Sequence, residues 1–152
     1  MNTSHLNVLT LTSLFPNQQQ PHLGIFVRER MKEVAKLCNL KVIAPVPWFP
    51  SIKIFRKWHR FSQIPYHEIQ EGIEIFHPRF FIIPKIMRSI YGFLYFLCIL
   101  PYVLKVRKSF NFDLIDVHWA YPDGFAGVIL GKILHKPVII TVRGNDIYLY
   151  TK

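Results

Sequence analysis

Cysteine is scarce in this sequence, and its cysteines form no recognisable motif. Cys38 and Cys98 are the only two among 152 residues, each lies in an apolar stretch, and no CxxC or Cys/His cluster occurs. This usage argues against a disulfide framework and against a zinc site. We therefore expect no metal in the protein and a reducing, cytoplasmic environment.

Several catalytic signatures are also missing. The sequence has no GxGxxG after its first apolar segment and no GxxxxGK[ST], so neither classical dinucleotide binding nor a P-loop is supported. It has no GxSxG elbow and no HExxH, and no pair of carboxylates stands out for acid and base catalysis. The longest apolar run, residues 90–104, contains Pro101 and is shorter than the roughly 20 residues that span a bilayer. We expect it to form a buried or membrane-facing helix.

Acidic residues are few, since 9 Asp and Glu stand against 19 Lys and Arg, giving a formal net charge of +10. Such an excess favours an anionic partner: nucleic acid, an anionic membrane face or a phosphorylated small molecule. Composition alone does not choose among the three. The hydrophobic share of 51% is sufficient for one domain with its own core.

The basic segment 53–61 mixes cations with aromatic residues. It is a solvated loop with a few buried aromatics, a nucleic-acid site, or a surface for an anionic membrane with Trp58 and Phe61 in the interface. We favour the membrane, because no nucleic-acid-binding pattern accompanies the charge and a second basic, apolar stretch, PKIMRSIYGFLYF, begins at Pro84. The predicted membrane-surface residues are Lys53, Arg56, Lys57, Trp58 and Arg60.

Short β-branched runs alternate with amphipathic segments along the whole chain. The expected strands cover residues 7–15, 40–46, 73–76, 113–117 and 137–142, and the expected helices cover 24–37, 89–108 and 123–134. Strands that are apolar on both faces indicate a parallel sheet covered by helices on both sides. The predicted class is a Rossmann-like α/β domain.

Polar residues follow three of these strands, where open parallel sheets bind their ligands. They are the loop that ends at Gly24, then His118, and then the segment that begins with Arg143. We expect all three to face one crevice. Pro122 and Asp123 suit the first turn of a helix, and we interpret both as structural.

Each candidate has a plain alternative. Gly24 either merely starts a helix or lets a phosphate approach the backbone N–H groups there. Arg28 is either a solvated surface charge or a ligand-binding residue, and His118 is either a hydrogen-bonded core histidine or a functional one. Arg143 and Asp146 either pair with each other in a turn or bind a ligand.

Five segments together resemble a known family. TSLFP, GIFVRERMKEVAKL, KVIAPVPWFP, FDLIDVHWAYPDGFAGVILGKIL and KPVIITVRGNDI, in this order, resemble the N-terminal domain of the family 4 retaining glycosyltransferases, which have the GT-B fold. The resemblance covers essentially the whole chain. It implies sugar transfer from a nucleotide-sugar donor to an acceptor, with retention and without a metal or other cofactor, in an enzyme whose N-terminal domain mainly shapes the acceptor site.

The resemblance also assigns roles to residues. It implies that His118 lies beside the donor sugar as the catalytic-site histidine, that Gly24 lies near the donor diphosphate, and that residues 141–146 line the cleft. Many relatives have two adjacent glycines where this chain reads PHLG, and many have a histidine where Arg143 stands. The predicted substrate-binding residues are Gly24, Arg28, Arg143, Asn145 and Asp146.

The family's C-terminal domain, with its two donor-gripping glutamates, has no counterpart in the sequence. We therefore expect residues 1–152 to be the acceptor-side half of an enzyme at the cytoplasmic face of a membrane. It would act on a lipid-linked or saccharide acceptor, have little activity alone and need the missing domain as its partner. The alternative is a non-enzymatic module that binds a membrane surface or an anionic ligand; nucleic acid is not an expected partner.

Overall fold

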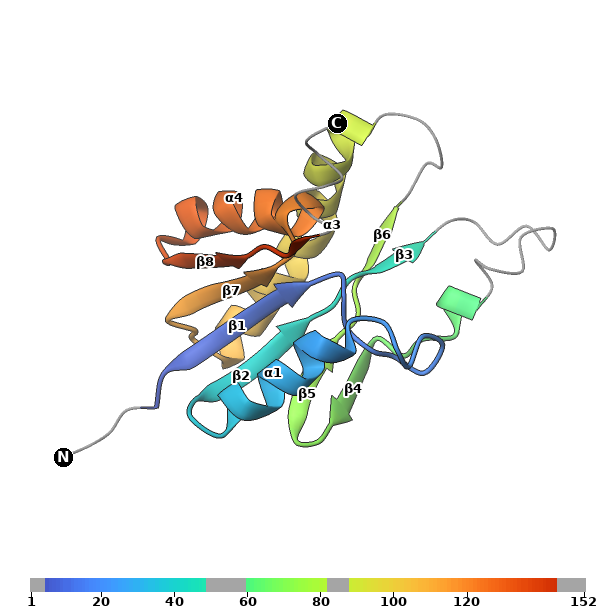
Figure 1. The fold of residues 1–152 in the computed structure, drawn as a ribbon. Coiled ribbons are helices and arrows are strands. Elements are labelled where there is room, and N and C mark those ends of the chain that lie inside the picture. The colour runs from blue at the N-terminus through green and yellow to red at the C-terminus, as the bar shows by residue number, and fades with distance from the viewer. Residues whose placement is uncertain (1–4, 49–59, 82–87, 145–152) are drawn as a thin grey trace.

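The computed structural model describes residues 5–48, 60–81 and 88–144 (Figure 1). Strands and helices alternate in it, as the sequence predicts. The strands are β1 (Asn7–Thr12), β2 (Asn39–Ile43), β3 (Val46–Trp48), β4 (His67–Gln70), β5 (Ile73–Phe76), β6 (Arg79–Phe81), β7 (Leu114–His118) and β8 (Val138–Thr141). The helices are α1 (Ile25–Ala35), α3 (Arg88–Ser109) and α4 (Phe125–Leu134), and a single wide turn, η1 (Ala120–Gly124), precedes α4.

A six-stranded sheet organises the molecule, in the order β4-β5-β2-β1-β7-β8. Its strands run parallel except β4, which pairs antiparallel with β5 at one edge. Figure 1 shows the arrowheads of β1, β2, β7 and β8 pointing the same way, so that their carboxyl ends share one edge. The predicted Rossmann-like α/β class is confirmed.

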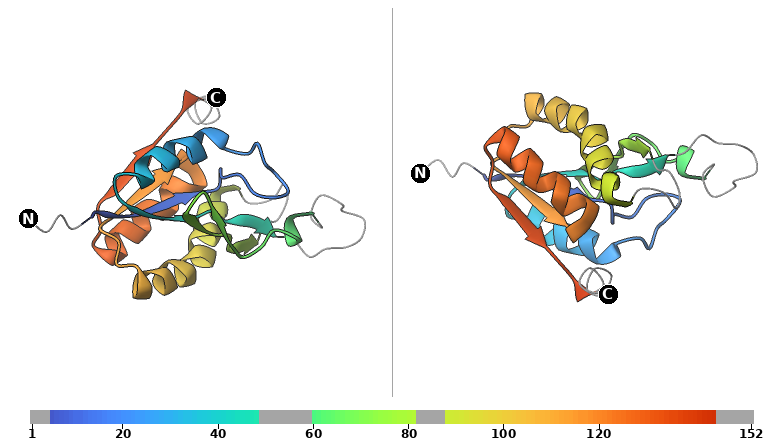
Figure 2. Two further views of the ribbon diagram at one scale, coloured as in Figure 1. Left: turned by 90° about the horizontal axis from the view of Figure 1, so that it is seen from below. Right: turned by 90° about the horizontal axis from the view of Figure 1, so that it is seen from above.

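Helices cover both faces of the sheet, α1 on one side and α3 with α4 on the other (Figure 2). Val27 and Met31 of α1 are fully buried against one face. The other face packs on Tyr95, Ile99 and further residues of α3 and α4. A methyl group at Gly127 would lie 2.6 Å from Val117 Cγ2, so α4 approaches β7 closely only because residue 127 is glycine.

Two features of the sheet region were not expected from the sequence. The β4–β5 hairpin turns at Glu71 and Gly72, whose φ angles of 51° and 82° are typical of a two-residue hairpin turn. β4 was not predicted from the sequence, because three of its four side chains are polar and none is buried. β3 and β6 form a separate two-stranded parallel sheet beyond the carboxyl ends of β2 and β5.

Helix α3 matches the expected helix 89–108 almost residue for residue. It continues past Leu104, so its segment Ile90–Ser109 has the length and, with a mean hydropathy of 1.5, the apolarity of a membrane span. No other helix in the described segments meets both criteria. The inner side of α3 belongs to the sheet's core, and a third of the apolar window, 33%, is buried there.

Candidate functional site

Three polar side chains lie abreast at the carboxyl edge of the central strands. The register pairs Thr12 of β1 with His118 of β7, and His118 with Thr141 of β8. Side chains two residues apart share a face, so Thr10 and Asp116 face the same side. Thr10 donates a hydrogen bond to Met31 Sδ of α1, which shows that this is the α1 side of the sheet.

His118 is buried but only partly hydrogen-bonded. Its side chain is 1% exposed, and Nε2 lies 3.0 Å from Asp116 Oδ2. Nδ1 has no hydrogen-bond partner among the described residues, and neither has Asp116 Oδ1. Buried polar atoms are nearly always paired, so the open Nδ1 points to a ligand or a water.

His77 shows what a structural histidine looks like in this fold. It is fully buried, with Nδ1 2.8 Å from the Ala44 carbonyl oxygen and Nε2 2.7 Å from Glu68 Oε1. Both ring nitrogens are therefore occupied, as in an ordinary core histidine. His118 differs from it in two ways: one nitrogen has no partner in the described part of the chain, and the residue lies at the carboxyl edge of the sheet, where parallel sheets commonly bind ligands.

The Asp116 carboxylate determines which nitrogen of His118 is open. In the neutral ring the proton stays on Nε2, facing the carboxylate, and Nδ1 offers a lone pair. We predict that Asp116→Ala converts the nearly pure Nε2–H tautomer of His118 into a mixture of the two tautomers. The ¹⁵N chemical shifts of the imidazole ring at alkaline pH provide the measurement. The His77 signals are the internal control. An unchanged His118 tautomer would show that Asp116 does not orient the ring.

Gly24 shapes the start of α1 at the same edge. It adopts the left-handed conformation, with φ 61° and ψ 31°, at the N-cap position. A Cβ there would overlap the carbonyl oxygen of Leu14, in the loop that follows β1. The first turn of α1 contains no acidic residue to neutralise the positive end of its dipole. Gly24 is thus a required helix-start glycine, and its contact with a phosphate stays a prediction.

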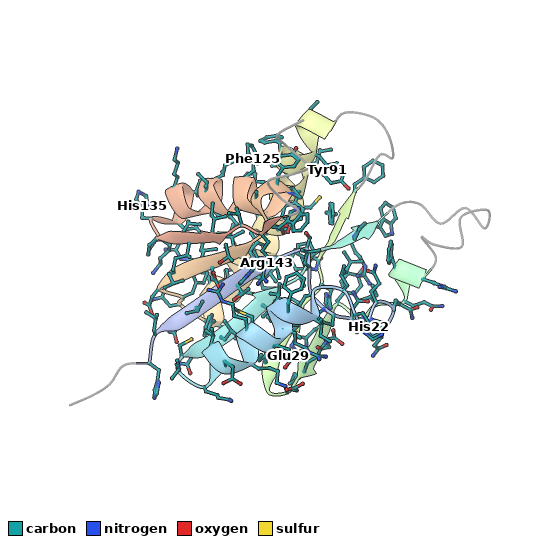
Figure 3. The ribbon with its side chains drawn as sticks, viewed as in Figure 1. His22, Glu29, Tyr91, Phe125, His135 and Arg143 are labelled. Atoms are coloured by element: carbon teal, nitrogen blue, oxygen red, sulfur yellow. The ribbon has the colours of Figure 1, made fainter. Side chains whose placement is uncertain are left out.

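Arg143 and the first turns of α1 lie side by side. The Arg143 guanidinium carbon is 4.1 Å from the centroid of the Phe26 ring, and Figure 3 shows Arg143 beside α1. One turn further along, Arg30 donates a hydrogen bond to Thr141 Oγ1 at 3.1 Å. The end of β8 and the start of α1 are therefore neighbours, so the structure gathers Gly24, His118 and Arg143 at one edge.

Of the remaining predicted site residues, Arg28 binds a neighbouring glutamate, and Asn145 and Asp146 lie outside the described residues. Arg28 lies on α1, where its guanidinium binds Glu29 at 2.8 Å and, with Lys32, lowers the pKa of that carboxyl. Its role toward a substrate stays a prediction. In the described segments no group of three or more His, Cys, Asp or Glu could hold a metal ion.

The predicted membrane segment is described only at its end. Lys53, Arg56, Lys57 and Trp58 lie outside the described residues, and Arg60 is exposed. The interpretation of Phe61 was wrong: it does not face an interface. Its side chain is 8% exposed and packs with Val46 and Ile64, because β3 and the turn after residue 60 enclose a small core of their own.

Asp123 is structural, as predicted, but the sequence did not predict its two side-chain partners. It is fully buried at the start of α4, where Ser13 Oγ donates a hydrogen bond to Oδ2 at 2.7 Å and the Tyr95 hydroxyl donates one to Oδ1. Burial raises the pKa of Asp123 to about 7, although both hydrogen bonds favour the charged form. The carboxyl thus joins the loop after β1, α3 and the turn before α4. The available signal was Tyr95, one of three tyrosines in the mainly apolar α3.

Comparison with known proteins finds a relative that matches nearly the whole chain. No protein-family model matches the chain. The chain is 26% identical over 148 residues, 95% of its length, to a protein of Bacillus subtilis (strain 168) named "Putative teichuronic acid biosynthesis glycosyltransferase TuaC". It spans 38% of the length of that relative.

Proposed function

We propose that this chain is the acceptor-side part of a glycosyltransferase that moves a sugar from a nucleotide-sugar donor to a lipid-linked or saccharide acceptor. The observation that carries the proposal is His118, a buried histidine with one open nitrogen at the carboxyl edge of a parallel sheet. The likeness to a relative named as a glycosyltransferase, over 95% of the chain, supports sugar transfer as the chemistry at that edge.

The finer assignment rests on the family resemblance. In this proposal the chain is the N-terminal domain of a retaining family 4 enzyme with the GT-B fold. His118 accepts a hydrogen bond from a donor-sugar hydroxyl through Nδ1, because Asp116 holds the proton on Nε2. Gly24 lets the donor diphosphate approach the N-terminus of α1, where no acidic side chain repels it. Arg143, Asn145 and Asp146 are further substrate-binding residues in this proposal.

Catalysis in the proposed enzyme comes from positioning and from stabilising the leaving diphosphate, not from a protein nucleophile. A second domain, which in this proposal is the larger remainder of a chain like the relative's, holds the donor. The 152 residues alone therefore have little or no transferase activity. Sugar transfer by the isolated chain that disappears on His118→Ala would contradict this part of the proposal.

Replacing the residue aligned with His118 by alanine in the full-length relative is expected to lower kcat by about 10²–10³-fold, with a smaller effect on KM. The reason is that a hydrogen bond to the reacting sugar is strongest in the transition state. Steady-state kinetics with the purified enzyme provide the measurement. Full turnover, combined with lower thermal stability of His118→Ala in the present chain, would show that His118 is a core histidine like His77.

A second candidate is a non-enzymatic module that binds a membrane surface. The apolar outer side of α3 favours it. An NMR titration distinguishes the two functions. A transferase domain shows chemical-shift changes around His118 when nucleotide sugars or acceptor sugars are added. A pure surface module binds anionic vesicles and responds to neither.

A further inference from the structure

Helix α3 is apolar on all its sides but is covered on only one. Its inner side carries Tyr95, Ile99 and Val103, each fully buried. Its outer side carries a line of large apolar side chains at helical spacing, Ile90, Phe93, Leu97 and Leu104, which are 38%, 49%, 46% and 41% exposed. A helix that is apolar on all sides is normally buried on all sides. The exposed outer residues of α3 therefore indicate a second binding partner besides the sheet.

Helix α4 extends this surface. Phe125, Val128 and Ile133 are 43%, 41% and 51% exposed on α4. The two helices pack against each other on the same face of the sheet, and the Phe125 ring lies close to Gly92 of α3. Figure 3 shows Phe125 near Tyr91 of α3, at the end where the two helices meet. The exposed residues of α3 and α4 therefore form one surface, here called the α3–α4 layer.

Glutamates are confined to one part of the molecule, whereas cations occur on both sides of the sheet. All five glutamates of the chain lie on α1 or on the β4–β5 hairpin with its turn: Glu29, Glu33, Glu68, Glu71 and Glu74. Neither α3 nor α4 contains an aspartate or a glutamate. The last turns of α3 instead expose Lys105, Arg107 and Lys108, and α4 exposes Lys132. The α3–α4 layer is thus mainly apolar, and all of its charged side chains are basic.

We propose that the α3–α4 layer docks on an anionic lipid bilayer, with α3 lying along the interface rather than crossing it. Phe93, Leu97 and Leu104 enter the boundary between headgroups and acyl chains, and Lys105, Arg107 and Lys108 meet lipid phosphates. α3 does not cross as a span, because its inner side would have to leave the core that it forms with β1, β7 and α4.

The basic residues of the α3–α4 layer favour a lipid surface over a protein partner. A protein partner for a bare apolar helix face would not require cations without any acid around it, whereas an anionic bilayer attracts each of them. The proposal does not depend on sugar transfer. Its failure would leave the proposed function standing, and the failure of the proposed function would leave the docking surface standing.

Vesicle cosedimentation of the 152-residue chain tests the proposal. We expect binding to phosphatidylcholine vesicles that contain phosphatidylglycerol and much weaker binding to phosphatidylcholine alone. The double variant Phe93→Ser, Leu97→Ser should lower the partition coefficient at least about tenfold, because two apolar anchors are lost. Arg107→Gln, Lys108→Gln should lower it about tenfold or more at low ionic strength and have little effect at high salt.

Matched controls come from the α1 side of the sheet. Leu37, two residues after α1, is 80% exposed, so Leu37→Ser removes an even more exposed apolar side chain away from the layer. Lys32→Gln, Lys36→Gln removes two cations from α1. Both controls should keep vesicle binding within about twofold of wild type, because neither side chain reaches the bilayer. If the Phe93, Leu97 double variant fails to fold, as judged by circular dichroism, the single variant Leu104→Ser replaces it.

Three results would overturn the proposal. The first is a folded protein that does not bind anionic vesicles. The second is an equal loss of binding in the α1-side controls, which would indicate binding by net charge alone. The third is a self-associating chain whose oligomers dissociate on Phe93→Ser, Leu97→Ser while vesicle binding is unchanged, which would assign the α3–α4 layer to a second copy of the chain.

Discussion

Replacing Gly24 with alanine is expected to lower the free energy of unfolding by about 2–4 kcal/mol. Two effects add at this position. Alanine is strained at φ 61°, and its Cβ would overlap the Leu14 carbonyl oxygen, which is backbone and cannot rotate away. The loop after β1 or the first turn of α1 must therefore move. Urea unfolding measures the change, and an unchanged m-value identifies it as a change in stability.

Gly72 provides the matched control for this prediction. Its φ of 82° is also left-handed, but a Cβ there would meet nothing within 4 Å. Gly72→Ala thus retains the conformational strain and removes the clash, and we expect a loss of only about 1 kcal/mol. Equal losses in the two variants would mean that the loop after β1 does not pack on Gly24.

Asp123→Asn is expected to remove a large part of the pH dependence of stability. The folded-state pKa of Asp123 is about 7, raised by burial from 3.8. Because the folded state keeps this proton longer, the stability that Asp123 contributes is complete below pH 3.8 and is lost as the pH rises to about 7. The difference between the two pKa values corresponds to about 4 kcal/mol.

The variant isolates this contribution, because asparagine has no proton to lose. The free energy of unfolding of Asp123→Asn minus that of wild type should rise by up to about 4 kcal/mol between acidic and neutral pH and stay constant above it. Denaturant titrations at a series of pH values give this difference. A difference that stays flat over this range would show that folding does not shift the pKa of Asp123.

Tyr95→Phe sharpens the Asp123 test. It removes the hydroxyl that donates to Asp123 Oδ1 and leaves Ser13 as the donor to Oδ2. The charged carboxylate loses one of its hydrogen bonds, so the pKa of Asp123 should rise further. Carboxyl ¹³C titration of Asp123 measures this shift directly. A lower pKa in Tyr95→Phe would contradict the hydrogen-bond assignment.

The sequence alone determined the fold class and the position of His118 at the end of a strand. β-branched runs and amphipathic segments have different periods, so their alternation is visible without a structure, and β5 was predicted with its observed bounds. The position of His118 after a buried strand predicts that it lies at the carboxyl edge of the sheet, and the register confirms this. These properties are local in sequence or follow from the general geometry of parallel sheets.

Only the tertiary structure decided which side chains meet. Ser13 and Asp123 are 110 positions apart in sequence, and their hydrogen bond depends on how α3 and α4 pack on the sheet. In sequence, His77 and His118 are both histidines that follow apolar strands. The structure separates them. Ala44 and Glu68 contact both nitrogens of His77, whereas Nδ1 of His118 has no partner among the residues that the structure describes. Periodicity shows which face a residue takes, but the atoms opposite it come from distant segments of the chain.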